Sequence, residues 1–377
     1  MSYTTKAGNH SLIFGLQGFY DDLEESGMYV IVDESSSFLG ESYRSVAHKS
    51  AREFGFFVQD EWALGKKLLV VPGFRVDYHS SGEEYTADKQ VSDLSEFPKT
   101  EFEETAINPR LAVKYQLSES ITLRANAGTG FRAPFGFSED LHLCSGSPRV
   151  WKSSDLNPEK SVSFNFSADY YGTRLRVSAN LFRTDLKDKI GFTDADENVS
   201  SLGYDYQWKN IDDAFVQGAE LSILANLHKD LDLGFDFTYN QGEYKNMRED
   251  WVGTAFENDS RYISRFPVTT GNLRLEYYPG TWTFALSGNY QGNMYIDYYN
   301  EEIDPELGDQ SKIKKTDPFM LFNARVSKRL NQFKLYAGVN NIFGYVQDER
   351  HLDDAAFMYG PVYGTMWYAG ISLSIKH

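Results

Sequence analysis

The stretch Ser161–Tyr170, which reads SVSFNFSADY, alternates polar and apolar residues without interruption. Alternation with a period of two is the pattern of a β-strand whose two faces meet different surroundings. The apolar face would carry Val162, Phe164, Phe166, Ala168 and Tyr170. In a soluble protein such a face packs on a core, whereas in a membrane barrel it contacts lipid. The rest of the sequence decides between these two environments.

The same alternation recurs at 174–181, 231–239, 272–277 and 367–375. The segments 161–170, 231–239 and 367–375 run for nine or ten residues, longer than the common strand of about five or six. About nine to eleven residues is the length that a tilted strand needs to cross a bilayer. Charged residues also occupy polar positions well inside these segments. The pattern therefore indicates strands with one face toward lipid and the other toward a hydrated lumen.

Short and long connections alternate between these segments. Short turns are expected near residues 65, 119, 172, 229, 279 and 331. Long polar stretches are expected at 21–50, 79–104, 131–159, 187–210, 243–265, 292–316 and 344–363. This layout predicts about fourteen strands in one antiparallel up-and-down meander, as in outer-membrane barrels with short periplasmic turns and long outer loops. Aromatic residues near the short turns, such as Trp62 and Trp282, fit the girdles of such barrels.

Composition excludes several other classes of protein. The net charge of -17 opposes nucleic-acid binding, which requires an excess of Lys and Arg. No continuous apolar run reaches about 18 residues, which excludes transmembrane helices. The start MSYTTKAGNH has no signal-peptide pattern, so an exported protein would begin here as a mature piece or a fragment. Cys144 is the single cysteine and forms no internal disulfide.

Two soluble architectures fit less well. A propeller would repeat sequence signatures at about 40–50 residues, and this chain repeats only the alternation. A β-sandwich seldom needs so many long loops. We therefore expect an all-β, transmembrane, antiparallel up-and-down β-barrel that occupies residues 1–377 as a single barrel portion.

Five motifs are distributed over most of the chain. Phe54–Ser80 contains the elements QDEW and PGFRVD, and Ile107–Pro134 begins with NPRL after one residue and ends with GTGFRAP. The motifs LNPEKS (156–161), FVQGAEL (215–221) and LYAGVNNIFG (335–344) follow. Together these motifs resemble those of TonB-dependent outer-membrane receptors and occur in the order of that family, the last with Gly where Asp is usual.

This resemblance implies part of a 22-strand barrel with an N-terminal plug domain, of which this chain would supply about the last fourteen strands. No plug domain is recognised, so the plug and early strands are expected from a missing portion or a separate chain. That part would also contact the TonB complex. The resemblance further implies location in the outer membrane of a Gram-negative bacterium, in contact with membrane lipid and lipopolysaccharide.

The implied function is the energised import of a bulky, scarce nutrient, with a ferric siderophore favoured and haem or cobalamin next. No cofactor is required, and haem or the ferric siderophore would be only the transported ligand. The alternative is a passive porin-like channel closed by about fourteen strands. An enzyme is not expected, because no G-x-S-x-G, H-E-x-x-H or comparable element occurs.

Four candidate ligand-binding residues lie in or beside the long stretch 131–159: Arg132, His142, Asn157 and Glu159. Arg132, Asn157 and Glu159 lie at the ends of this stretch and would contact plug or ligand. In the structural alternative, Arg132 would pair with a carboxylate and stabilise the strand ends. For His142, the family resemblance implies ligation of haem iron, because haem receptors of this family can use a histidine in this interval and imidazole suits iron. The alternative for His142 is a loop side chain without a ligand.

A candidate metal site lies in TDADEN, residues 193–198. Asp194, Asp196 and Asn198 are spaced like the oxygen ligands of a calcium loop. Val199 stands where an EF-hand requires Gly, so the choice is between a looser Ca²⁺ site in an outer loop and a solvated acidic loop.

Overall fold

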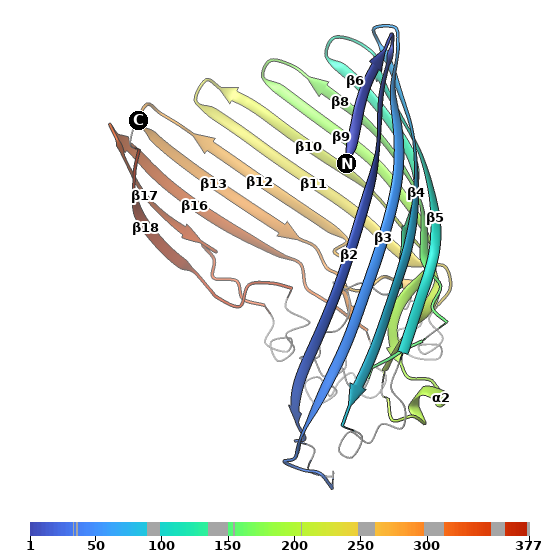
Figure 1. The fold of residues 1–377 in the computed structure, drawn as a ribbon. Coiled ribbons are helices and arrows are strands. Elements are labelled where there is room, and N and C mark those ends of the chain that lie inside the picture. Colours follow the sequence, from blue (N-terminus) through green and yellow to red (C-terminus); the bar gives the residue numbers. More distant parts are fainter. Residues whose placement is uncertain are drawn as a thin grey trace. The chain divides into compact units, whose positions relative to one another are not determined.

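A computed structural model describes residues 1–32, 34, 37–88, 99–134, 150–153, 155–204, 206–247, 261–297, 313–347 and 359–374. These residues form a 16-stranded sheet and a separate two-stranded sheet (Figure 1). The large sheet follows chain order, so each main strand pairs with the next along the sequence. The predicted antiparallel up-and-down meander is therefore confirmed.

The first strands are β1 (Ser2–Ala7), β2 (His10–Val30), β3 (Ser42–Leu64), β4 (Leu68–Ala87), β5 (Lys99–Gln116), β6 (Ile121–Arg132), β8 (Glu159–Tyr171) and β9 (Leu175–Asp194). The later strands are β10 (Tyr206–His228), β11 (Leu231–Tyr244), β12 (Thr269–Tyr277), β13 (Trp282–Gln291), β16 (Phe319–Leu330), β17 (Phe333–Asn340) and β18 (Met366–Leu373). The short β7 (Val150–Lys152) pairs with β10 in parallel. The strands β14 (Tyr295–Asp297) and β15 (Ile313–Lys315) form the small sheet. A short helix, α2 (Glu197–Ser200), follows β9.

The structure corrects the strand boundaries expected from sequence. The expected loop 21–50 is largely strand, because β2 continues to Val30 and β3 begins at Ser42. These two strands have 21 and 23 residues, about twice the length that crosses a bilayer. Each face of their outer parts mixes polar with apolar residues, such as Tyr43 and Val46 on opposite faces of β3, so the simple alternation disappears there while backbone pairing continues. The additional strand β1 precedes the first predicted one and turns into β2 at Gly8, whose φ is 59°.

Contacts divide the chain into two compact units. The first comprises Met1–Val113, Asn126–Ser163 and Asp185–Ala214, and the second comprises Lys114–Ala125, Phe164–Thr184 and Phe215–His377. No helix in the described part of the chain is long and apolar enough to cross a membrane.

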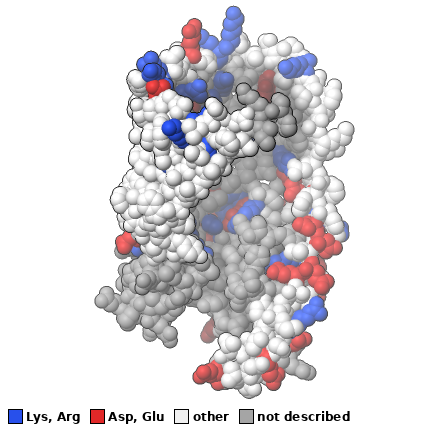
Figure 2. Space-filling view, turned by 90° about the vertical axis from the view of Figure 1, so that its left-hand side faces the viewer, with Lys and Arg blue, Asp and Glu red and all other residues white. Residues whose placement is uncertain are grey.

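The apolar strand faces are exposed and do not form a core. Phe164 and Phe166, from the stretch that opened the question, are 50% and 49% exposed. If these side chains faced water, each would forgo the free energy that full burial provides, about 1.5–3 kcal/mol. Figure 2 shows that charged side chains gather in groups on one side of the molecule, with uncharged surface between these groups. The apolar face of the strands is thus suited to contact with lipid.

The opposite face of the same strands is polar and internally bonded. Within the second unit, Ser178 donates a 2.6 Å hydrogen bond to Asp169, and Arg124 pairs with the same carboxylate. Asp169 alternates with the apolar Ala168 and Tyr170, so one strand separates the two environments residue by residue.

Candidate functional site

The carboxylate of Glu159 is the centre of a charged network in the first unit. Glu159 is the first residue of β8, and its side chain is only 9% exposed. It lies 2.6 Å from Nη2 of Arg132 and 3.6 Å from Nζ of Lys189. It also accepts a 2.7 Å hydrogen bond from the backbone N–H of Ile190. A buried carboxylate requires such partners, because desolvation otherwise disfavours the charge.

Strand order explains why these partners meet. β8 lies between β6 and β9 in the sheet. Arg132 is the last residue of β6, and Lys189 belongs to β9. Glu159 therefore reaches a cation on each neighbouring strand, and the three side chains join three strands where the long connections begin.

The backbone of β9 is unusual beside this network. Asp188 has a φ of 55°, a left-handed conformation that is uncommon for residues other than Gly. Its N–H donates to Oδ1 of Asp213 at 3.2 Å, and its carbonyl accepts from Nδ2 of Asn210 at 2.7 Å. Two side chains of β10 therefore satisfy the backbone groups at this irregular point.

Asn210 extends the network to the chain just before β8. The Asn157 N–H donates to Oδ1 of Asn210 at 2.8 Å, and Nδ2 of Asn210 donates to the Asn157 carbonyl at 3.0 Å. This reciprocal pair imitates the pairing of two strands. It fixes the chain just before Pro158, where proline already favours an extended backbone.

The structure thus brings together three of the four residues proposed as ligand-binding: Arg132, Asn157 and Glu159. Arg132 pairs directly with Glu159, in agreement with the structural alternative in which Arg132 pairs with a carboxylate, while the backbone of Asn157 bonds to Asn210 of β10. Their role in ligand binding stays a prediction. His142 lies outside the described residues.

Sequence reasoning missed Lys189, Asn210 and Asp213. Asn210 and Asn157 are 53 residues apart, and no motif links them. The available signal was the presence of polar residues inside otherwise alternating strands, which marks a lumen position without identifying its partner.

The candidate metal residues are placed around the start of α2. Asp196 is the N-cap, and its side chain accepts from the N–H groups of Asn198 at 3.1 Å and Val199 at 3.0 Å. The bond from Val199 lowers the pKa of Asp196, and a side-chain bond from Gln207 acts in the same direction. The side chain of Asp194 lies outside the described residues, and Asn198 is exposed. Among the residues that are described, no group of three or more His, Cys, Asp or Glu is arranged to hold a metal ion. Calcium binding stays a prediction.

An aromatic and basic cluster lies on the long connections of the second unit. The rings of Tyr262 and Tyr295 stack at 4.4 Å with an interplanar angle of 10°. Nζ of Lys315 lies 5.1 Å from the Tyr295 ring centroid. The pairing of β14 with β15 places Lys315 directly opposite Tyr295. Tyr295 is buried, at 7% exposure, whereas the side chain of Lys315 is exposed, so the ammonium group of Lys315 is the part of this cluster that can contact an anion.

Two of the recognised motifs have clear structural roles. In FVQGAEL, a Cβ on Gly218 would lie 2.7 Å from Cζ of Phe182 and against the Tyr239 carbonyl, so the position admits only Gly. In NNIFG, Asn341 has a φ of 52° and exchanges hydrogen bonds with the backbone of Tyr345 at 2.9 and 2.6 Å. It thereby fixes the chain that leaves β17.

Comparison with known proteins agrees with this architecture. Residues 2–342 match the family model described as TonB dependent receptor-like, beta-barrel. The chain is 26% identical over 363 residues to the iron-regulated outer membrane virulence protein of Vibrio cholerae, covering 91% of this chain and 48% of that protein. It is 24% identical over 317 residues to the ferric enterobactin receptor of Pseudomonas aeruginosa, covering 78% of this chain and 38% of that protein.

A solved structure shows the same fold. The ferric-catecholate import receptor Fiu of Escherichia coli K12 superposes with a TM-score of 0.73 at 16% identity, covering 99% of this chain and 53% of that chain. The chain therefore spans about half the length of the curated relatives it matches.

Proposed function

Because this chain belongs to the TonB-dependent receptor family, we propose that it forms part of the barrel of an importer for a bulky, scarce nutrient. The family match over residues 2–342 is the observation that carries this proposal. Location in the outer membrane of a Gram-negative bacterium follows from the family, which consists of transport proteins and not of enzymes.

The favoured nutrient is a ferric siderophore. Both relatives described above have iron in their names, and they match most of this chain. The exposed Lys315, held against the buried Tyr295 ring, supports this choice, because ferric catecholate complexes carry negative charge. The cluster lies on the long connections, which face the outside in barrels of this type. Haem and cobalamin are the next candidates.

The strands described here would supply the wall and outer contacts of the importer. The polar face, including the networks at Glu159 and Asp169, would face the lumen. Energy from the TonB complex would enter through a plug and early strands outside this chain. In this arrangement, the chain's own residues bind and orient the ligand, and the remaining part couples its passage to energy.

Uptake of ⁵⁵Fe-enterobactin tests the proposal. We expect saturable uptake in cells that carry the gene for the whole protein, lost on gene deletion and abolished by a protonophore. Uptake that persists with the protonophore would favour the passive channel, and the absence of gene-dependent uptake would remove enterobactin-type siderophores as ligands.

Lys315→Gln tests the cluster itself. Removing the cation should raise the apparent KM roughly tenfold, equivalent to about 1.4 kcal/mol, while assembly is unchanged. Lys99→Gln is the matched control, because Lys99 is also exposed, at 60%, and its contacts are ion pairs with Glu84 and Glu101. Equal kinetics for the two variants would contradict a role for Lys315.

A further inference from the structure

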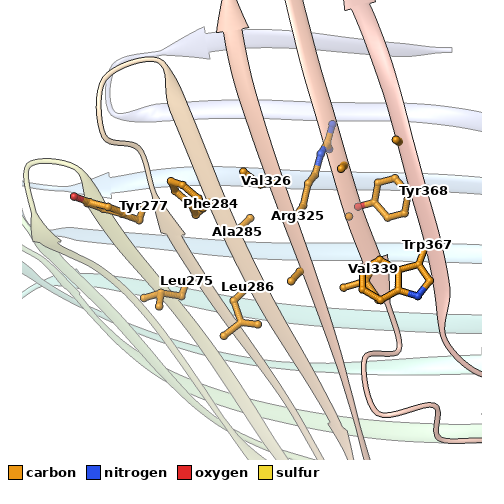
Figure 3. A pocket seen from close by; sticks show the side chains of 14 residues that line it. Leu275, Tyr277, Phe284, Ala285, Leu286, Arg325, Val326, Val339, Trp367 and Tyr368 are labelled. Atoms are coloured by element: carbon orange, nitrogen blue, oxygen red, sulfur yellow. The ribbon is translucent and has the colours of Figure 1, made fainter.

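A shallow apolar pocket of about 760 Å³ lies on strands β12, β13, β16, β17 and β18 in the second unit. Its volume is within the range of small-molecule sites, about 300–1,000 Å³. Figure 3 shows Phe284 and Leu286 on one side of the pocket and Trp367 on the other.

Strand register places the lining side chains on a single face. Phe284 is directly opposite Val326, Val326 is opposite Ala337, and Ala337 is opposite Ala369. Directly opposed residues of antiparallel strands project to the same side of the sheet. This row therefore descends from one large aromatic ring to three small side chains across four strands.

The neighbouring row supplies the second wall. It runs through Leu286, Ala324, Val339 and Trp367 in the same register. Trp367 is 79% exposed, whereas Val339 is 8% exposed. The two rows together make a groove with a floor of Ala and Val between a wall of Phe284 and Leu286 and a wall of Trp367.

The groove belongs to the lipid face of the sheet. Its residues alternate with polar residues of the opposite face, such as Arg325 and Ser327. Leu335 and Ile371 continue the groove's face toward the short turn and are 39% and 69% exposed. No acid or base lines this face of the groove among the pocket residues, since Arg325 points to the other side by register.

A single cation marks the end of the groove nearest the short turn. Lys328 is directly opposite Trp282 in register, and its Nζ lies 4.7 Å from the Trp282 ring centroid. Lys328 is two residues from the end of β16, beside the short turn to β17. Within the described residues no carboxylate forms an ion pair with Lys328. Trp and Lys side chains at this level are typical of a membrane–water interface.

We propose that this groove binds one glycerophospholipid of the periplasmic leaflet. One acyl chain lies on the Ala and Val floor between Phe284 and Trp367, and the phosphate contacts the ammonium group of Lys328. The apolar floor matches the chain, and the cation matches the phosphate. Short turns of such barrels face the periplasm, so the charged end selects phospholipid over lipopolysaccharide, which occupies the outer leaflet. The inference rests on membrane location and is independent of which nutrient is imported.

Native mass spectrometry of the detergent-purified protein tests the site. Phosphatidylglycerol is the probe, and diacylglycerol, which lacks the phosphate, is the comparison lipid. We expect the wild type to retain one phosphatidylglycerol molecule after mild delipidation. Ala337→Leu fills the floor and should weaken binding of both lipids at least tenfold. Ala179→Leu is the matched control, because Ala179 is an exposed alanine on the apolar face of β9.

Lys328→Gln separates the phosphate contact from the chain contact. It should weaken phosphatidylglycerol binding about five-fold, equivalent to about 1 kcal/mol for one basic residue at an anionic lipid. Binding of diacylglycerol should be unchanged. Lys334→Gln is the control, because Lys334 lies on the adjacent strand β17 and on the opposite face of the sheet from Lys328.

Several results would overturn the proposal. They are wild-type-like binding by Ala337→Leu, equal loss by Ala179→Leu, or preferential retention of lipid A. Should Ala337→Leu fail to assemble, tryptophan quenching decides the question. One equivalent of phosphatidylglycerol with brominated acyl chains should quench the wild type in detergent, and most of that quenching should disappear in Trp367→Phe. Unchanged quenching in Trp367→Phe would contradict a chain beside Trp367.

Discussion

The guanidinium group of Arg132 lies 2.6 Å from the carboxylate of Glu159, and this ion pair joins the last residue of β6 to the first residue of β8. The connection between these two strands is the long stretch that holds His142. Glu159 also accepts the Ile190 N–H of β9, so one buried carboxylate fixes three consecutive strands of the sheet.

Glu159→Gln should destabilise the protein. The neutral amide removes the charge that faces two cations and weakens the bond to the Ile190 N–H. We expect a loss of about 1–3 kcal/mol, below the cost of a fully buried pair because Arg132 is 38% exposed. Urea titration of the protein refolded in detergent measures this loss.

The matched control is Glu104→Gln. Glu104 pairs with Lys160 at 3.5 Å, and both side chains are more exposed than Glu159, at 33% and 55%. Its loss should be below about 1 kcal/mol. Equal losses for the two variants would mean that burial adds nothing to the network at Glu159.

Phe164→Arg and Asn165→Arg test the orientation of β8. Phe164 alternates with Asn165 and is 50% exposed on the apolar face. Arginine at Phe164 should cost about 2–4 kcal/mol near the bilayer midplane, whereas arginine at Asn165 should be much milder. Heat-modifiable migration on gels reports the assembled fraction. Similar fractions for both variants would reject the assigned faces.

Gly218→Ala should impair assembly. Its new methyl group would lie 2.7 Å from Cζ of Phe182 and against the Tyr239 carbonyl, which forces the ring or strand to move. Overpacking of this kind costs about 1–3 kcal/mol. Gly234→Ala is the control, because its nearest neighbour would be Leu224 Cδ2 at 3.5 Å, an ordinary contact. Thermal unfolding in detergent should separate the two; a Gly218→Ala protein as stable as Gly234→Ala would contradict the close approach.

The cap of α2 should be sensitive to acid. The bond from Val199 lowers the pKa of Asp196 below its value in the unfolded chain. The ionised Asp196 therefore stabilises the helix at pH values above the ordinary pKa of Asp. This stabilisation is lost as the pH falls through the lowered folded-state value. Hydrogen exchange of the peptide 196–204, corrected for intrinsic rates, should show this loss of protection.

Substitutions at Asp196 separate the charge from the cap. Asp196→Asn keeps a capping oxygen and should remove the pH dependence, while Asp196→Ala should cost about 0.5–1 kcal/mol of local stability at every pH. If Asp196→Asn retained the acid sensitivity of the wild type, another group would be responsible.

Much of the fold was predictable because strand alternation depends on local sequence alone. Val162, Phe164 and Phe166 share a face whatever their partners are, so the lipid and lumen faces follow directly from parity. The short turns and the family motifs then ordered the strands. The outer parts of β2 and β3 were missed because polar and apolar residues are mixed on both of their faces, so these segments have no clean alternation to detect.

The network at Glu159 was predictable only in part. Arg132, Asn157 and Glu159 were selected because they bound one long stretch of sequence. Lys189, Asn210 and Asp213 were not, because their positions depend on the pairing of β9 with its neighbours and on the left-handed Asp188. A shift of register by one residue would separate these groups from their partners on the neighbouring strands.

The sequence by itself therefore determined the alternating faces, the order of the strands and the family, since these depend on residue parity and on motifs within single segments. The tertiary structure alone decided which residues meet across strands. The lipid groove shows this clearly, because Ala337, Val326 and Ala369 are unremarkable alanine and valine residues in three separate strands. Register places them side by side between Phe284 and Trp367, and only that placement creates the groove.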